Sequence, residues 1–277
     1  MSRRHASGAE SAKGLLLTVL GELVLPAERA SWTATFIEVL GRLGVEEGAV
    51  RQALSRMAAD GWLRSERVGR RTLWRLSASG ERLLVEGTER IYGFTGPASD
   101  WDGRWLLVLA RVPETDRAAR HLLRTRLSWA GLGSPAPGVW IGTRTDRLVE
   151  VEEVLRRAGV FDDAEAFIAE HRGHTRLEAM VANAWDLEAI EHEYARFVAE
   201  FSSPLTEQPL TRLIELVHAW RRFPSMDPGL PRELLPSGWS GTQAACLFRS
   251  RHAEWSVRAM AEWEQLRAAS PDPRARR

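Results

Sequence analysis

The chain has 277 residues, of which 44% are hydrophobic and 27% charged, and its formal net charge is +1. This composition is typical of a globular protein, and the length favours two or three domains. No stretch approaches the roughly 18 uncharged apolar residues of a membrane span, and the basic start has no apolar run after it that would make a signal peptide. The single cysteine, Cys246, excludes an intramolecular disulfide framework and favours a reducing cytoplasm. We expect Cys246 to be buried in an apolar helix.

Two helices are expected first. Residues 11–26, "SAKGLLLTVLGELVLP", carry leucine and valine at three- and four-residue spacing and stop at Pro26. Residues 31–44 follow, with Ser31 or Thr33 as a possible N-cap and Gly44 in the position of a left-handed C-cap. Each segment therefore predicts a helix with one apolar face.

A third helix should begin at Glu46 and Glu47, whose charges complement the positive end of a helix dipole. Apolar residues at positions 50, 53, 54 and 57 form a stripe for the core. The opposite face carries Gly48, Arg51, Gln52, Ser55 and Arg56. Guanidinium and amide groups can hydrogen-bond guanine and adenine edges in the major groove, and Ser and Arg also hold phosphates.

Residues 62–76, "WLRSERVGRRTLWRL", alternate around Gly69 and predict a β-hairpin. Its tip carries Arg67, Arg70, Arg71 and Thr72. Between positions 51 and 75, seven arginines face only Asp60 and Glu66, so the local charge is +5. Such a patch on a balanced chain is the electrostatic footprint of a protein that binds a phosphate backbone. We interpret helix, turn, helix and basic hairpin as a winged helix-turn-helix that binds DNA; a winged helix used only for protein contacts is the alternative.

The remaining chain divides into two parts. Residues 93–103 resemble a linker, and strands alternate with helices from 104 to 172, which predicts a ferredoxin-like α+β sandwich closed by a strand with Val160, Phe161 and Phe167. Three apolar-faced helices are then expected at 184–201, 209–223 and 242–266. The fold class is thus multidomain α+β: a winged helix-turn-helix domain at 1–95, a ferredoxin-like central domain at 100–176 and a helical C-terminal domain at 180–277.

Signs of catalysis are absent from the sequence. It has no Walker loop, no G-x-G-x-x-G after a strand and no G-x-S-x-G elbow. His171 and His174 lie three apart but are separated by Gly173 and have no obvious third ligand, so no metal site is expected. We therefore predict no catalytic residues, no metal and no enzymatic activity.

Several motifs carry a family resemblance. They are "GVEEGAVRQALSRMAADGWL", "GRRTLWRLSASG", "WDGRWLLVLARVPE", "GVWI", "AWDL" and above all "RRFPSMDPGLPRELLPSGWSG". Over roughly residues 14–268 the chain resembles the PaaX family of bacterial transcriptional repressors, known for the control of phenylacetate degradation genes. The resemblance implies the same three domains, the central one similar to small CRISPR-associated nucleases. It also implies a dimer that an acyl-CoA effector, phenylacetyl-CoA in the best-known members, releases from DNA.

Two details qualify this resemblance. Related nucleases use an acid just before the "VPE" motif, but here that place is Arg111, and an arginine cannot bind a catalytic metal. Among the twelve tryptophans, some of those in the C-terminal third are candidates to line an acyl pocket. We predict effector binding by Trp220, Arg221, Arg222 and Trp239, with the arginines holding coenzyme A phosphates.

The sequence thus predicts a cytoplasmic, homodimeric repressor of a catabolic operon that binds double-stranded operator DNA and an acyl-CoA effector, with no membrane contact and no other cofactor. The alternatives are an activator, a regulator that needs no effector, or a metal-dependent nucleic-acid hydrolase.

Overall fold

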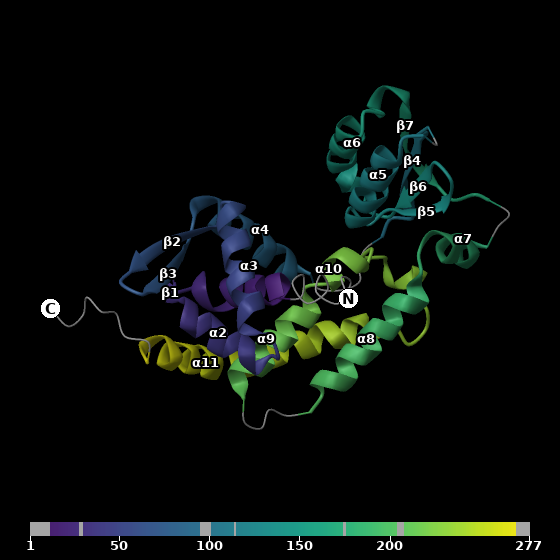
Figure 1. Cartoon of the computed structure of the whole chain (residues 1–277). Helices are drawn as coiled ribbons and strands as arrows, with labels where there is room; N and C mark the ends of the chain where they lie inside the picture. The colour runs from purple at the N-terminus through teal and green to yellow at the C-terminus, as the bar shows by residue number, and fades with distance from the viewer. Residues whose placement is uncertain are drawn as a thin grey trace, which may run out of the picture. The chain divides into compact units, whose positions relative to one another are not determined.

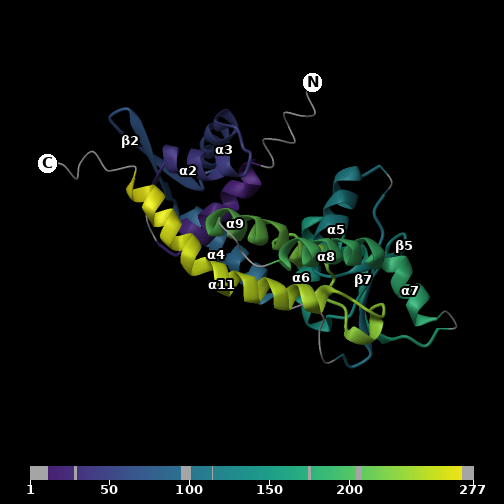
Figure 2. The ribbon, with the colours of Figure 1, turned by 90° about the horizontal axis from the view of Figure 1, so that it is seen from below.

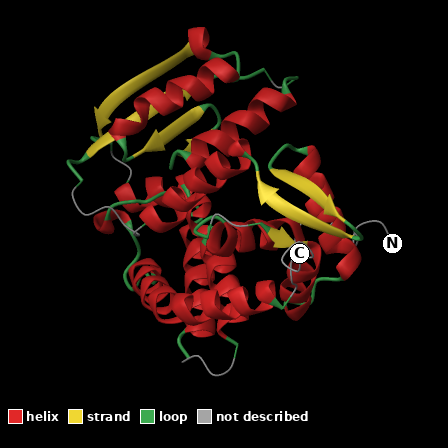
Figure 3. Ribbon diagram, turned by 90° about the vertical axis from the view of Figure 1, so that its left-hand side faces the viewer, coloured by secondary structure: helices red, strands yellow, loops and turns green. Residues whose placement is uncertain are grey.

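The computed structural model describes residues 12–27, 30–94, 101–113, 115–173, 176–203 and 208–269, so most of the expected linker at 93–103 lies outside it. The protein is α+β, with two separate antiparallel sheets and helices making up most of the rest (Figure 1, Figure 3). Its contacts form two compact units. Unit 1 comprises Met1–Gly93, Phe201–Arg221 and Leu247–Arg277, and unit 2 comprises Phe94–Glu200 and Arg222–Cys246. The contacts therefore divide residues 180–277 between both units, and the three domain boundaries drawn from the sequence stay a prediction.

Unit 1 begins with the expected helices. Residues 12–19 are α-helical and continue into a π-helical turn, η1 (Leu20–Val24), followed by α2 (Thr33–Arg42) and α3 (Glu47–Ala59). After α2, Gly44 has φ 78° and the N–H of Val45 donates to the carbonyl of Leu40 at 3.0 Å. This is the left-handed helix end that the glycine predicted.

The first sheet has the strand order β1-β3-β2, from β1 (Ser31–Trp32), β2 (Leu63–Val68) and β3 (Arg71–Leu76). The hairpin is confirmed: Val68 pairs with Arg71 across a two-residue turn in which Gly69 has φ 60°. The capping expectation for α2 is wrong, because Ser31 lies in β1 and no side chain caps the helix. Instead the Thr33 hydroxyl donates to the carbonyl of Thr72 at 3.2 Å and accepts from Trp74 Nε1 at 2.9 Å, so that it joins α2 to β3.

The start of α4 (Ala78–Gly93) packs directly on the start of β2. The Ser77 N–H donates to the carbonyl of Trp62 at 3.0 Å, and the Ser77 Oγ accepts from the Gly80 N–H at 3.1 Å as an N-cap. Gly80 lies so close to Trp62 that an added Cβ would be 2.1 Å from its carbonyl oxygen. The junction between hairpin and helix therefore requires a residue without a side chain.

Two distant segments complete unit 1. These are α9 (Pro209–Trp220) and the part of α11 (Gly241–Ala268) that begins at Leu247, which lie side by side in Figure 2. Trp220, Trp255 and Trp263 are at most 1% exposed. The Trp263 ring lies 5.9 Å from that of Phe36 in α2. The core of the N-terminal segment is thus shared with the C-terminal helices.

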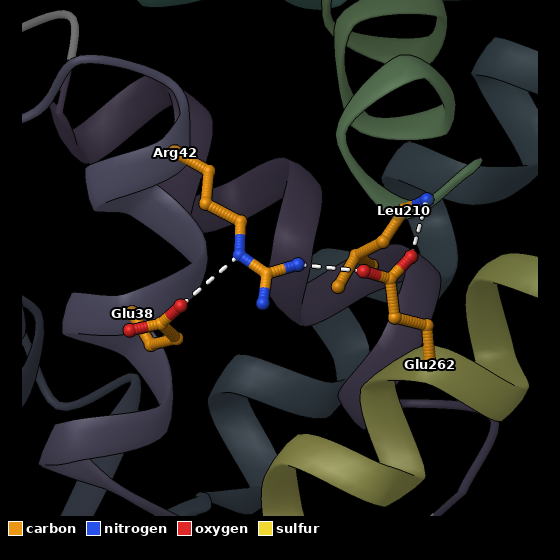
Figure 4. Close-up of polar contacts among 4 residues, drawn as sticks. All are labelled: Glu38, Arg42, Leu210 and Glu262. Atoms are coloured by element: carbon orange, nitrogen blue, oxygen red, sulfur yellow. Dashed lines mark hydrogen bonds and ion pairs between the residues drawn. The ribbon is translucent and has the colours of Figure 1, made fainter. Parts of the chain in front are cut away.

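A polar contact reinforces this packing. Arg42 of α2 donates to Glu38 at 3.1 Å on its own helix and to Glu262 of α11 at 2.6 Å (Figure 4). The second oxygen of Glu262 accepts from the N–H of Leu210, at 3.2 Å. This N–H is in the first turn of α9, where no helical carbonyl is available. One carboxylate therefore fixes three helices.

Unit 2 contains the second sheet, whose order is β5-β6-β4-β7 and whose neighbours are all antiparallel. Its elements follow one another as β4 (Arg104–Ala110), α5 (Arg117–Trp129), β5 (Gly133–Ala136), β6 (Val139–Gly142), α6 (Leu148–Arg157) and β7 (Ala164–Glu170). Alternate residues of β4, such as Leu106 and Val108, form one core with Leu123 of α5 and Val151 of α6. Both helices thus cover the same face of the sheet (Figure 1). The closing strand is confirmed as β7 and contains Phe167, which is 47% exposed on this edge strand, but Val160 and Phe161 precede the strand and lie outside it.

The other helices of unit 2 are α7 (Leu177–Ala184), α8 (Leu187–Phe201, of which Phe201 belongs to unit 1) and α10 (Phe223–Met226); short 3-10 turns lie at η2 (Thr145–Arg147), η3 (Phe161–Asp163) and η4 (Arg232–Leu234). Tyr194 of α8 stacks on Phe223 at 4.1 Å and donates to Asp227 at 2.6 Å. Burial raises the pKa of the Asp227 carboxyl, and burial also raises the pKa of the Tyr194 hydroxyl. Cys246 is exposed, contrary to expectation.

Two glycines of α4 should respond in opposite ways to alanine. Gly80→Ala should lower the free energy of unfolding by about 2 kcal/mol or more, because the Trp62 carbonyl cannot move without opening the hairpin. Gly87→Ala meets nothing within 4 Å and should raise the stability by about 0.5–1 kcal/mol. Urea unfolding followed by circular dichroism measures both, and a stable Gly80→Ala variant would contradict the close approach.

Candidate nucleic-acid interface

Helix α3 separates its two faces as its sequence predicts. Val50, Ala53, Leu54 and Met57 are at most 3% exposed and hold the helix against unit 1. The residues predicted to contact DNA, Gly48, Arg51, Gln52, Ser55 and Arg56, are all exposed on the opposite face. The helix thus presents a continuous row of hydrogen-bonding side chains to solvent.

The hairpin β2–β3 exposes the second predicted set. Arg67, Arg70 and Arg71 are exposed at and beside the turn, and Thr72 is half-buried, with its backbone carbonyl accepting from Thr33. Arg64 and Arg75 are also exposed and lie directly opposite each other in the strand register. Like charges at facing positions repel each other, so the bare hairpin carries a cost that a bound anion would relieve.

The ion pairs of this region leave several guanidinium groups free. Its acids are engaged: Asp60 with Lys13 at 2.8 Å, and Glu47 with Arg51 at 2.6 Å in an exposed pair of small energetic value. Within the described residues, no hydrogen bond or ion pair engages the side chains of Arg56, Arg64, Arg67, Arg70 and Arg75. Arginines elsewhere commonly have a carboxylate, as Arg144 has Asp146 at 2.7 Å. Five unpaired arginines therefore lie on α3 and the hairpin, where they form a surface suited to a polyanion.

Unit 2 contains a large pocket that the sequence did not predict. Its volume is about 1190 Å³, and it lies against the end of β4, one face of α5, the β5–β6 turn and the start of α8. Arg111, Arg120 and Arg124 line it together with aromatic and aliphatic side chains. The i, i+4 spacing of Arg120 and Arg124 is visible in the sequence, but the tertiary structure is needed to show that Arg111 lines the same pocket.

Models of one protein family match most of the chain. The PaaX-like protein model matches residues 11–80, the PaaX protein central Cas2-like domain matches 98–181, and the PaaX-like protein C-terminal domain matches 185–265. The transcriptional repressor PaaX of Escherichia coli strain K12 is 32% identical over 257 residues, which cover 87% of this chain and 80% of that protein. The chain belongs to the PaaX family. The resemblance stated from its motifs is confirmed.

A solved structure also resembles this PaaX family member. An uncharacterized protein from Mycobacterium tuberculosis superimposes with a TM-score of 0.59 at 21% sequence identity, covering 90% of this chain and 96% of its own. At this identity the likeness shows a shared fold.

The four residues predicted to bind the effector divide between the two units. In unit 1, Trp220 is fully buried and stacks on Phe248 at 4.7 Å, and Arg221 donates to the carbonyl of Gly14 at 2.7 Å. Burial lowers the pKa of Arg221. In unit 2, Arg222 is 3.7 Å from Glu193, and Trp239 lines a separate pocket of about 600 Å³. Their role in effector binding stays a prediction.

The described residues bear on two further features, a metal site and a membrane-spanning helix. The described residues contain no group of three or more His, Cys, Asp or Glu side chains placed to hold a metal ion, and His174 lies outside them. None of the described helices is both long and apolar enough to cross a bilayer.

Proposed function

We propose that the chain is a DNA-binding transcriptional regulator that acts as a repressor. The observation that carries this proposal is the set of unpaired arginines on α3 and the β2–β3 hairpin. The name of the Escherichia coli relative, a transcriptional repressor, supports it.

In this proposal α2, α3 and the hairpin form a winged helix-turn-helix. Helix α3 enters the major groove, where Arg51, Gln52 and Arg56 meet base edges, and the hairpin is the wing, whose Arg67, Arg70 and Arg71 contact phosphates. Because Arg51 has only a weak exposed pair with Glu47, it can exchange that carboxylate for a guanine edge or a phosphate at little cost.

The protein acts as a homodimer joined through unit 2. The strand order of its sheet is that of a ferredoxin-like sandwich, and α5 and α6 cover one face only. On the other face, Leu109 and Phe167 are 39% and 47% exposed on the adjacent strands β4 and β7, and Leu107 lies opposite Phe167 in the register. A second copy of the chain would bury this apolar face and present two α3 helices to an inverted repeat.

An acyl-CoA effector such as phenylacetyl-CoA then releases the dimer from the operator of a catabolic operon in the cytoplasm. This part follows the family resemblance. It requires that the effector bind the DNA-free state more tightly than the DNA-bound state. An activator, or a regulator without an effector, would use the same DNA surface, because the sign of regulation depends on operator position.

The rival from another class is a metal-dependent nucleic-acid hydrolase built on unit 2. Such an enzyme needs acidic ligands for its metal, but Arg111 directly follows β4 and the described residues contain no cluster suited to a metal. A cleavage assay with added Mg²⁺ or Mn²⁺ tests this rival directly.

Base recognition should depend on α3. Arg51→Ala or Arg56→Ala should abolish the preference for operator over random DNA, at a cost of about 1–3 kcal/mol per lost base contact, without changing the fold. Arg258→Ala, an exposed arginine of α11 in the same unit, is the control and should bind as wild type does. Fluorescence anisotropy with the protein's own promoter region measures the affinities, and an unchanged operator preference in both α3 variants would remove them from the base-reading role.

Phosphate contact should depend on the wing. Arg70→Ala should weaken binding to every sequence alike and reduce the slope of log K against log salt by about 1, because one fewer phosphate is neutralised. Titrations at several salt concentrations give this slope. A slope equal to that of wild type would mean that the hairpin tip points away from DNA.

Self-association should depend on one face of β7. Phe167→Glu should shift the dimer toward monomer, because it places a charge in the apolar face proposed to be buried. Ile168→Glu is the matched control: it lies next along the same edge strand, 51% exposed, on the opposite side of the sheet. Sedimentation velocity separates the two species; a dimeric Phe167→Glu variant would exclude this face as the interface.

A further inference from the structure

The unit 2 pocket concentrates positive charge. Arg111 follows β4, and Arg120 and Arg124 lie one turn apart on α5. Among the described residues that line the pocket, the only acid is Asp186, so their net charge is +2. The carboxylate of Asp186 already accepts from the Ala189 N–H at 3.0 Å, at the start of α8.

Two of these arginines have no partner of their own. Within the described residues, neither Arg111 nor Arg124 has a side chain engaged in a hydrogen bond or ion pair. Both are exposed at the pocket rather than paired across the surface, as Arg156 is with Glu152 and Arg157 with Glu153. Guanidinium groups that line one pocket without carboxylate partners can bind an anion.

The remaining wall is apolar and partly flat. Trp140, Trp185, Leu132 and Ile190 line the pocket. The wall at Trp185 is tightly packed: a Cβ on Gly133 would lie 2.5 Å from the Trp185 ring and 2.6 Å from the Ala184 carbonyl. Aromatic rings beside a few cationic groups are typical of small-molecule sites, and the pocket is large enough to hold a ligand of several hundred Å³.

We propose that this pocket binds an organic anion that combines a phosphate or carboxylate with a flat apolar group. Arg111 and Arg124 hold the anionic group, and Trp140 and Trp185 pack on the apolar one. The aromatic side chains of Trp140 and Trp185 in the pocket favour a small molecule over a nucleic-acid backbone, which open surface arginines such as those of the hairpin would bind. Only the consequence of binding, release of DNA, rests on the function proposed above; binding itself does not.

The test is isothermal titration calorimetry on the full chain without DNA. The probes are phenylacetyl-CoA, coenzyme A and phenylacetate. Binding of phenylacetyl-CoA and, more weakly, of coenzyme A assigns the arginines to phosphates; binding of phenylacetate alone assigns them to a carboxylate. Either result supports the proposal if the binding depends on Arg111 and Arg124. The proposal is overturned if none of the probes binds at millimolar concentration.

Three variants decide that dependence. Arg111→Gln and Arg124→Gln should each weaken the bound probe about tenfold or more, since each loses a charge-assisted hydrogen bond. Arg117→Gln is the control: it is exposed on the same helix but does not line the pocket, and it should bind the probe as wild type does. Equal affinity in all three variants would place the ligand elsewhere. Because Arg111 and Arg124 are exposed, the Arg111→Gln and Arg124→Gln variants should unfold at the same midpoint as wild type. This comparison separates lost binding from lost folding.

The same variants separate this proposal from the proposed function. Without ligand they should bind promoter DNA with wild-type affinity, and only the ligand concentration needed for release should rise. If the chain binds a ligand through Arg111 and Arg124 but binds no DNA, the ligand site is supported and the regulatory function is excluded. If the chain binds DNA and a ligand releases it equally well from wild type and from the Arg111 and Arg124 variants, the regulatory function is supported and this ligand site is excluded.

Discussion

The hydrophobic core of unit 1 is closed by side chains that arrive from the far end of the chain. Trp220, Trp255 and Trp263 are at most 1% exposed, and Trp263 packs against Phe36 of the very helix that precedes α3. A large aromatic side chain contributes several kcal/mol when it is fully buried, so these contacts decide whether the N-terminal segment can fold as observed. The carboxylate of Glu262, held between Arg42 and the N–H of Leu210, adds direction to this apolar packing. The surface that presents α3 and the hairpin therefore depends on α9 and α11 as much as on its own sequence.

This dependence explains what could and could not be predicted. The two faces of α3 and the turn at Gly69 follow from local periodicity and backbone preference, which act within a few residues. Strand β1 could not be predicted, because two residues carry no periodic signal. The sequence predicts Ser31 as a helix cap, but the residue pairs with Trp74 in the sheet instead. We expect Trp220 to bind a ligand because it is a tryptophan next to two arginines, and this role stays a prediction, although its ring is fully buried in the core. The apolar helix around Cys246 predicts burial, but the residue is exposed, since an apolar residue is exposed wherever no other element covers it.

The positive charge of the α3 and hairpin region can be counted in the sequence, but which of its arginines are paired cannot. A net charge of +1 conceals two populations of arginine. Those on α6, such as Arg156 and Arg157, each face a glutamate four residues earlier and contribute little to the field. Five of those on α3 and the hairpin, Arg56, Arg64, Arg67, Arg70 and Arg75, have no side-chain partner among the described residues, while Asp60 is engaged by Lys13, the only lysine of the chain. Pairing rather than abundance thus creates the cationic surface, and the same distinction marks Arg111 and Arg124 within unit 2.

The chain passes between the two units four times, at Gly93–Phe94, Glu200–Phe201, Arg221–Arg222 and Cys246–Leu247. The fourth passage falls inside α11, and the second falls at the last residue of α8. Ile190 of α8 lines the pocket, while α11 carries Glu262 and the tryptophans that close the core beneath α3. Under the proposed function, a ligand that favours one position of α8 weakens DNA binding only if bound DNA favours a different position of that helix. If a pocket ligand weakens DNA binding, linkage requires that DNA weaken ligand binding by the same factor.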